Sequence, residues 1–199
     1  MRRGLRLSLT AFLAFLPALG AYAHPHVFIN SHVSVDFEGE AVSRISLEWT
    51  FDELFSQMVI SDYDKEKKGS FTEAEAAGLK KGAFDNLKNF HYFLALGIDG
   101  RSAELPPIRD FKPSIRDGKL VYSFYLPLAL QIPAAGRELR LTIYDDTYYV
   151  AFDKMSPADI AINGAGSIAV SVSIVKAKIK AEWPGQFMPD QMLLRLKKE

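Results

Sequence analysis

The chain has 199 residues, no cysteine, and 24 acidic and 24 basic side chains. This length is sufficient for one domain with a substantial hydrophobic core. The lack of cysteine excludes disulfides, thiolate metal sites and cysteine nucleophiles, and the balanced charge gives no reason to expect a nucleic-acid partner.

The first 23 residues have the pattern of a secretory signal peptide. Three arginines precede an apolar run, and Ala21 and Ala23 form a small-residue cleavage site. We therefore expect residues 1–23 to be removed, and residues 24–199 to form a single periplasmic domain. An uncleaved anchor is the alternative, although the apolar run is short for a membrane span.

Cleavage after Ala23 would place the sequence His24-Pro25-His26 at the new amino terminus. His24 would then carry a free α-amine and an imidazole, and neutral imidazole is the commonest metal ligand in proteins. Pro25 has no N–H to lose, so a full four-nitrogen plane is blocked and a brace geometry remains. Such donors favour Cu(II), Ni(II) or Zn(II) over Mg(II). The alternative is a short polar tail without a ligand.

Most of the remaining chain has the pattern of short strands. Alternating polar and apolar residues predict strands over 27–35 and 41–50, with a turn at Gly39. Residues 191–198 favour a short basic amphipathic helix or a frayed end. Further strand patterns, several of them following Asp-Gly turns, cover residues 92–98, 120–128, 139–143, 149–152 and 168–179. The pattern predicts an α+β protein with a mainly antiparallel, β-sandwich-like core.

The apolar period changes to that of a helix between about residues 51 and 90. The first helical stripe comprises Phe51, Leu54, Phe55, Met58 and Val59. The sequence Thr72-Glu73-Ala74-Glu75 has the pattern of a capping box and begins a second helix, which we expect to continue to about Phe90. We therefore expect an EF-hand-like helical hairpin inserted in the β-rich domain.

The loop between these helices, residues 64–75, has the length of an EF-hand calcium loop. A glycine stands at its sixth position, and the first, third, seventh and twelfth positions hold Asp64, Glu66, Ser70 and Glu75. However, Lys68 occupies a ligand position, and the neighbouring lysines repel a divalent ion. We therefore expect a helix–loop–helix turn that does not bind calcium.

Two other side chains are candidates to complete a metal site. His91 lies between the second helix and the next strand, where capping a helix or packing against aromatic rings is the alternative role. Asp145 follows an apolar strand and would either donate an oxygen or form a polar turn. His32 is a weaker partner, because six strand residues separate it from His26 by about 20 Å.

Five segments occur in a fixed order along the chain. They are His24-Pro25-His26-Val27-Phe28, Trp49-Thr50-Phe51-Asp52-Glu53, the loop over residues 64–75, Phe84-Asp85-Asn86-Leu87 and Tyr144-Asp145-Asp146-Thr147-Tyr148. Together they resemble the bacterial periplasmic family known as domain of unknown function 1007. This resemblance implies an exported accessory component of a transport system, and some relatives occur with nickel or cobalt transporters. Family loops are commonly rich in Asp and Gly where this chain has lysines.

We therefore expect a periplasmic metal-binding protein that serves a membrane transporter of nickel, cobalt, copper or zinc. His24 and His26 would be the primary ligands, and His91 or Asp145 would complete the site. A metal-free adaptor that docks on a transporter or envelope partner is the alternative, and oxidative chemistry at a copper brace is a third hypothesis. The sequence has no recognisable nucleophile elbow or phosphate loop, so we do not expect an enzyme.

Overall fold

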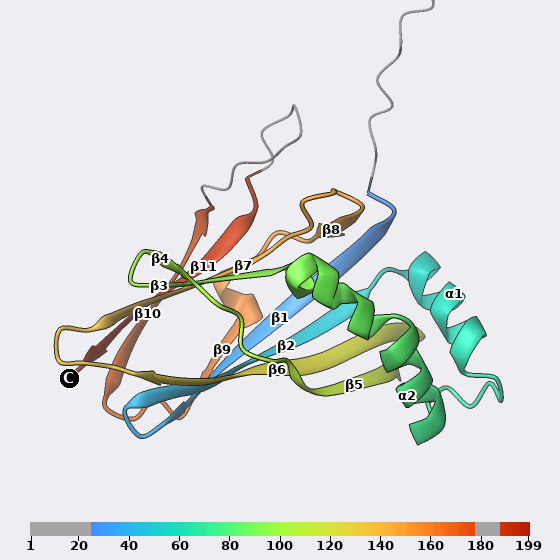
Figure 1. Ribbon diagram of the computed structural model, residues 1–199, viewed down its shortest axis with the longest axis horizontal. Coiled ribbons are helices and arrows are strands. Elements are labelled where there is room, and N and C mark those ends of the chain that lie inside the picture. Colours follow the sequence, from blue (N-terminus) through green and yellow to red (C-terminus); the bar gives the residue numbers. More distant parts are fainter. Residues whose placement is uncertain (1–24, 178–187) are drawn as a thin grey trace, which may run out of the picture.

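The computed structural model describes residues 25–177 and 188–199 (Figure 1). The expected signal peptide and His24 lie outside the described residues. Within the described ranges, no helix has the length and apolar character needed to cross a membrane.

Strands make up most of the described chain, and the helical segments lie between β2 and β3 and before β9. The strands are β1 (Val27–Glu38), β2 (Ala41–Phe51), β3 (Leu94–Ile98), β4 (Arg101–Ala103), β5 (Arg109–Arg116), β6 (Lys119–Gln131), β7 (Arg137–Ile143), β8 (Val150–Phe152), β9 (Ile160–Asn163), β10 (Ile168–Lys176) and β11 (Asp190–Lys198). The helices are α1 (Glu53–Tyr63) and α2 (Glu73–Gly82), with 3₁₀ segments η1 (Phe84–Phe93) and η2 (Pro157–Asp159).

The strands form two sheets. The first has the order β5-β6-β2-β1-β8, and β9 also pairs with β1. The second has the order β10-β11-β7-β3-β4. Pairing is antiparallel except where β8 and β9 run parallel to β1. The chain is therefore a mixture of helices with two mainly antiparallel sheets.

One hydrophobic core is shared by the two sheets. Trp49 on β2, Leu141 on β7 and Leu194 on β11 are each 0% exposed and belong to the same buried cluster. Burying a large apolar side chain contributes about 1.5–3 kcal/mol. Every second residue of β2 from Ile45 to Phe51 faces this core, as the period of a half-buried strand requires. Burial between the sheets thus replaces the disulfides that the chain cannot form.

The prediction of a helix or frayed end over residues 191–198 is wrong. These residues form β11, which is hydrogen-bonded to β10 on one side and to β7 on the other. Met192, Leu194 and Leu196 alternate into the core. A short apolar run fits either a helix or a strand, and here the neighbouring strands decide.

Helix α1 only partly follows the predicted stripe. Its N-cap is Asp52, whose carboxylate accepts the N–H of Phe55 at 2.9 Å. Val59 is buried, but Leu54 and Met58 are 81% and 55% exposed. The helix turns these two apolar side chains to the surface because the strands offer no neighbour on that side.

Helix α2 begins as predicted, with reciprocal capping bonds between Thr72 and Glu75. It ends at Gly82 rather than near residue 90, and η1 follows. A Cβ at Gly82 would lie 2.6 Å from the hydroxyl of Tyr63. The glycine therefore lets the Tyr63 ring at the end of α1 lie against α2.

Candidate functional site

Three segments that are distant in sequence meet near the start of β1 (Figure 1). His26 N–H donates to the carbonyl of Tyr149 at 2.8 Å, and Tyr144 N–H donates to the carbonyl of Phe93 at 2.8 Å. We call these segments, residues 26–28, 91–93 and 144–150, the amino-terminal corner. This corner includes three of the four metal ligands predicted from the sequence, and the fourth, His24, lies outside the described residues.

His26 has a fixed backbone and an exposed side chain. The N–H groups of His26 and Val27 both donate to the Tyr149 carbonyl, at 2.8 and 3.3 Å. The imidazole lies against the Tyr149 ring, with 5.1 Å between the ring centroids. Among the described residues, no hydrogen bond or ion pair involves its ring nitrogens. The ring is therefore held in place while its nitrogens stay available to a ligand.

Asp145 organises the loop that holds His26. Its side chain is only 4% exposed. The carboxylate accepts the Thr147 N–H at 2.9 Å, the Thr147 hydroxyl at 2.7 Å and the Val150 N–H at 2.8 Å. These bonds fix the turn that presents Tyr149 to His26. The local geometry favours a positioning role for this carboxylate, since protein donors already occupy both oxygens.

His91 lies in a strained turn that leads into β3. His91, Tyr92 and Phe93 have φ values of +51°, +51° and +55°. Left-handed backbone costs L-residues about 1–2 kcal/mol each. Phe93 anchors the turn, since it is buried against Trp49 with 6.2 Å between ring centroids, whereas His91 is exposed. Strain of this kind is concentrated at functional sites in proteins.

The described part of the corner is not a complete metal site. Within residues 25–177 and 188–199, no group of three or more His, Asp or Glu side chains is arranged to hold a metal ion. His26 and His91 are separate donors, and Asp145 is already hydrogen-bonded.

The carboxylates of the loop between α1 and α2 are bonded to the loop itself. Asp64 is buried and accepts the N–H groups of Lys68 and Gly69, at 3.0 and 2.8 Å. Glu75 accepts the N–H of Lys65 at 3.1 Å and that of Thr72 at 2.8 Å. The Thr72 bonds and, less strongly, the Lys65 bond lower the pKa of Glu75.

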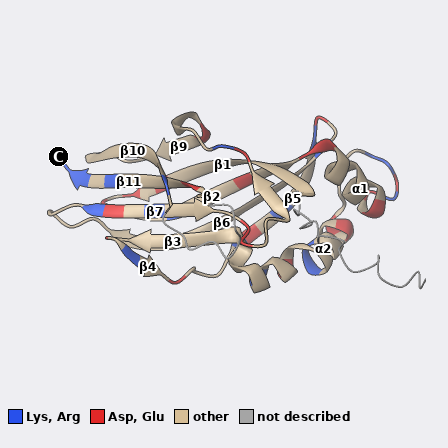
Figure 2. Cartoon of the chain, turned by 90° about the horizontal axis from the view of Figure 1, so that it is seen from above, with Lys and Arg blue, Asp and Glu red and all other residues tan. Residues whose placement is uncertain are grey.

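The remaining predicted ligand positions add little negative charge to this loop. Glu66 forms an ion pair with Lys68, and Ser70 is exposed. Figure 2 shows basic residues in the connection between α1 and α2. The sixth residue, Gly69, has a φ of +72°, which suits glycine at a sharp turn. The loop therefore has the shape of a cation site, but an internal lysine neutralises one of its acids.

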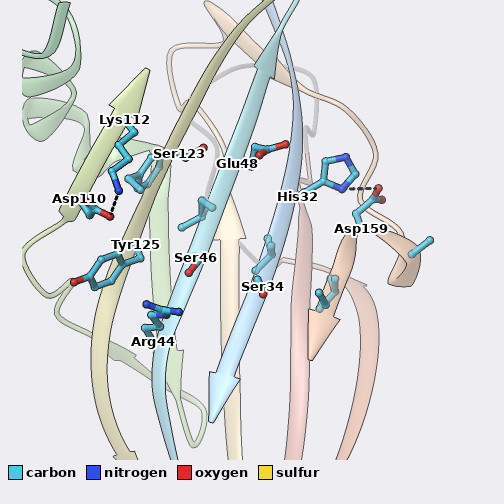
Figure 3. A pocket seen from close by; sticks show the side chains of 16 residues that line it. His32, Ser34, Arg44, Ser46, Glu48, Asp110, Lys112, Ser123, Tyr125 and Asp159 are labelled. Carbon is cyan, nitrogen blue, oxygen red and sulfur yellow. Dashed lines mark hydrogen bonds and ion pairs between the residues drawn. The ribbon is translucent and has the colours of Figure 1, made fainter. Parts of the chain in front are cut away.

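A shallow groove of about 530 Å³ crosses the outer face of the first sheet (Figure 3). Charged side chains along it are paired with one another. His32 Nδ1 lies 3.7 Å from Asp159, and Lys112 donates to Asp110 at 2.8 Å. These pairs occupy the groups that a charged ligand would need.

Glu48 in the same groove receives two bonds from Arg116, at 2.7 and 2.9 Å. These bonds lower the pKa of Glu48, and His32 on the neighbouring strand adds to the effect. The pairing of β1 with β2 is regular from Ile29 to Asp36, so β1 does not bend His32 toward the corner.

The fold and the corner together define a class: an α+β protein of two sheets with a helix–loop–helix segment and histidines at one end. The chain belongs to the family described as protein of unknown function DUF1007, whose profile matches residues 9–188. The resemblance predicted from the five ordered segments is thereby confirmed.

Two relatives show how far this similarity extends. An uncharacterized 15.5 kDa protein from the trpE 3′ region of Spirochaeta aurantia is 36% identical over 119 residues, which cover 58% of this chain and 84% of the relative. An uncharacterized protein of Haemophilus influenzae is 31% identical over 157 residues, which cover 77% of this chain and 72% of the relative.

Proposed function

We propose that this protein is a periplasmic metal-binding accessory component of a transport system for nickel, cobalt, copper or zinc. The amine and ring of a processed His24, with the ring of His26, would form the primary chelate. The observation that supports the proposal is the exposed imidazole of His26, which has no hydrogen bond to the described residues and stands on a backbone fixed by Tyr149. A fixed ligand loses little conformational entropy when it binds a metal.

The corner offers this chelate further support. Asp145 holds the turn that carries Tyr149, so it acts as a positioning residue for His26. His91 is exposed two residues before Phe93, whose carbonyl accepts the Tyr144 N–H, and it is the candidate for a third nitrogen. A transporter that accepts the ion would approach from this exposed end.

We also propose that the two sheets form a β-sandwich-like core and that residues 53–82 are an EF-hand-like insertion without calcium binding. The common core supports the first interpretation. The loop hydrogen bonds of Asp64 and Glu75 support the second, since both carboxylates are satisfied without an ion. The helix–loop–helix then serves as a structural element.

A metal-free adaptor is the second candidate function. Leu54 and Met58 stand four residues apart on α1 and are 81% and 55% exposed. Residues at this spacing lie on one helix face. In this hypothesis, a transporter or envelope partner covers that face, and the corner has no metal.

Calorimetry of the exported, processed protein with Cu(II) and with Ni(II) tests the metal proposal. Mass spectrometry first verifies that the chain begins at His24. We expect His26→Ala to lose more than about 100-fold in affinity, because even changes to residues behind a metal ligand cost 10–100-fold. His32→Ala, at an exposed histidine on β1, is the matched control and should bind as the unmodified protein does. Equal affinity in His26→Ala would contradict the proposal.

The adaptor hypothesis gives a different pattern. It predicts that no ion binds and that a double Leu54→Ser, Met58→Ser change abolishes co-purification with a membrane partner. Metal binding that persists in the double variant and depends on His26 would favour the accessory function over the adaptor.

A further inference from the structure

A second cavity, separate from the corner, lies between the two sheets at the ends of β7, β8 and β10 and the start of β11. Its volume is about 180 Å³. Ile143, Phe152, Met155 and Met188 give it apolar walls. An engineered apolar cavity of about 150 Å³ admits benzene. The space is therefore large enough for one aromatic ring or a short branched chain.

One residue that lines the cavity has a buried hydroxyl without a partner among the described residues. Ser31 lines it, and in the described part of the chain its Oγ is buried without a hydrogen bond. Ser31 pairs directly with Trp49 on β2, and the indole Nε1 of Trp49 is likewise buried and unbonded among the described residues. An unsatisfied buried polar group costs about 1–3 kcal/mol. Two such groups at one register position indicate that an acceptor is needed here.

Trp49 also stiffens the wall of this cavity. It is 0% exposed, and its ring meets that of Phe152 edge to face, with 5.5 Å between centroids. Phe124 packs on Trp49 in the same manner at 4.8 Å. Because these rings pack tightly, the apolar wall is preformed and does not collapse to fill the space.

Two lysines and two aspartates surround the opening, and one of these lysines is unpaired among the described residues. Lys176 donates to Asp190 at 2.6 Å, and Asp190 also accepts the Met155 N–H at 3.2 Å. Asp153 accepts the side-chain amide of Asn30 at 3.4 Å. Lys154 lines the same cavity and makes no hydrogen bond or ion pair with the residues that the structure describes. Its ammonium group would attract an anion.

We propose that this cavity binds a small monocarboxylate whose apolar body is about the size of one aromatic ring. The body lies against Phe152 and Met155, the Ser31 hydroxyl donates to a carboxylate oxygen, and the Lys154 ammonium balances the charge. This site is independent of the proposed metal chelate, since none of its residues belongs to the corner.

A benzoate titration of the processed full-length protein tests the proposal, with benzamide as the neutral analogue of similar shape. Calorimetry and the methyl resonances of Met155 report binding. We expect benzoate to bind at least 10-fold more tightly than benzamide. We expect Ser31→Ala and Lys154→Gln each to weaken benzoate binding at least 10-fold. Lys112→Gln, on the outer face of the first sheet, is the matched control and should leave binding unchanged.

If Ser31→Ala fails to fold, the titrations of the unmodified protein and of Lys154→Gln still test the proposal. The proposal is overturned if 10 mM benzoate leaves the Met155 methyl resonance unmoved, or if Lys154→Gln binds benzoate as tightly as the control. It is also overturned if a crystal soaked in benzoate holds only an ordered water on Ser31.

Discussion

The amino-terminal corner and the loop between α1 and α2 differ in what their polar side chains do. In the loop, Asp64 and Glu75 accept four backbone N–H groups of the loop itself. In the corner, Asp145 likewise accepts N–H groups of its own loop. The ring of His26 lies against Tyr149 and makes no hydrogen bond or ion pair with the described residues. Both regions have fixed backbones.

A sequence that resembles a ligand loop is a weaker guide to metal binding than whether its ligand atoms are already hydrogen-bonded within the protein. A carboxylate that closes its own loop must give up those bonds, or share them, to bind a cation. An imidazole whose nitrogens make no hydrogen bond to the protein has no such bond to lose when it binds a metal. We therefore propose metal binding at the corner and a structural role for the loop.

Removing the Asp145 charge should produce the largest effect on stability. Asp145→Asn replaces an acceptor of three bonds with a group that accepts through only one oxygen, and bonds to a buried charged acceptor contribute about 1.5–3 kcal/mol. We expect a loss of about 2–4 kcal/mol in urea unfolding, together with weaker metal binding through His26. Asp146→Asn is exposed and should change stability by less than about 0.5 kcal/mol. Equal stability of the two variants would contradict the organising role of Asp145.

Restoring acidic ligands should turn the loop into a calcium site. The double change Glu66→Asp, Lys68→Asp removes the internal ion pair and places carboxylates at the third and fifth positions. A calcium concentration of 100 times Kd would stabilise the fold by about 2.7 kcal/mol. We expect calcium to raise the melting temperature of this variant only. A comparable rise in the unmodified protein would show that the lysines do not prevent binding.

The capping box gives a smaller test of the loop as a structural element. Thr72→Ala removes the hydroxyl that accepts the Glu75 N–H at 3.3 Å, and loss of an N-cap costs about 1 kcal/mol. Denaturant unfolding should show this loss with or without calcium. Ser70→Ala, in the exposed part of the same loop, is the control and should be neutral. A calcium-dependent loss would instead indicate an ion in the loop.

Acid should weaken the loop through Glu75. The bonds from Thr72 lower the folded-state pKa of this carboxyl below its ordinary value of 4.5. Its contribution is therefore complete above that ordinary value and is lost as the pH falls through the lowered pKa. The stability difference between the unmodified protein and Glu75→Gln should be largest near pH 6 and should shrink toward pH 3. A difference that is constant with pH would contradict this account.

Much of the fold follows from local patterns in the sequence. The strands β1 and β2, the Asp-Gly turns and the capping box of α2 were predictable because each depends on residues close in the chain. The strand β11 was not, because the run Met192 to Leu196 becomes a strand only when β7 and β10 lie on both sides. The edge strand β5 was also missed, since its charges and Pro113 hide the alternation.

In the candidate site, too, the sequence indicated individual residues but not which distant segments come together. The sequence indicated His26 and Asp145, but only the fold shows that both act on one loop, because the parallel pairing of β1 with β8 brings them together. The left-handed turn at His91 has no local signal, since none of residues 91–93 is glycine. The cavity beside Ser31 depends on five strands, β1, β7, β8, β10 and β11, and could not be found from spacing alone.

A zinc titration of the exported protein, followed by NMR of ¹⁵N-labelled histidine rings, shows whether His24 and His26 bind one ion together. We expect the rings of His24 and His26 to shift together and to saturate at one equivalent of Zn(II), while the ring of His32 in its groove stays unchanged. A His26 ring that does not respond to excess Zn(II), or a response confined to His32, would contradict the metal proposal.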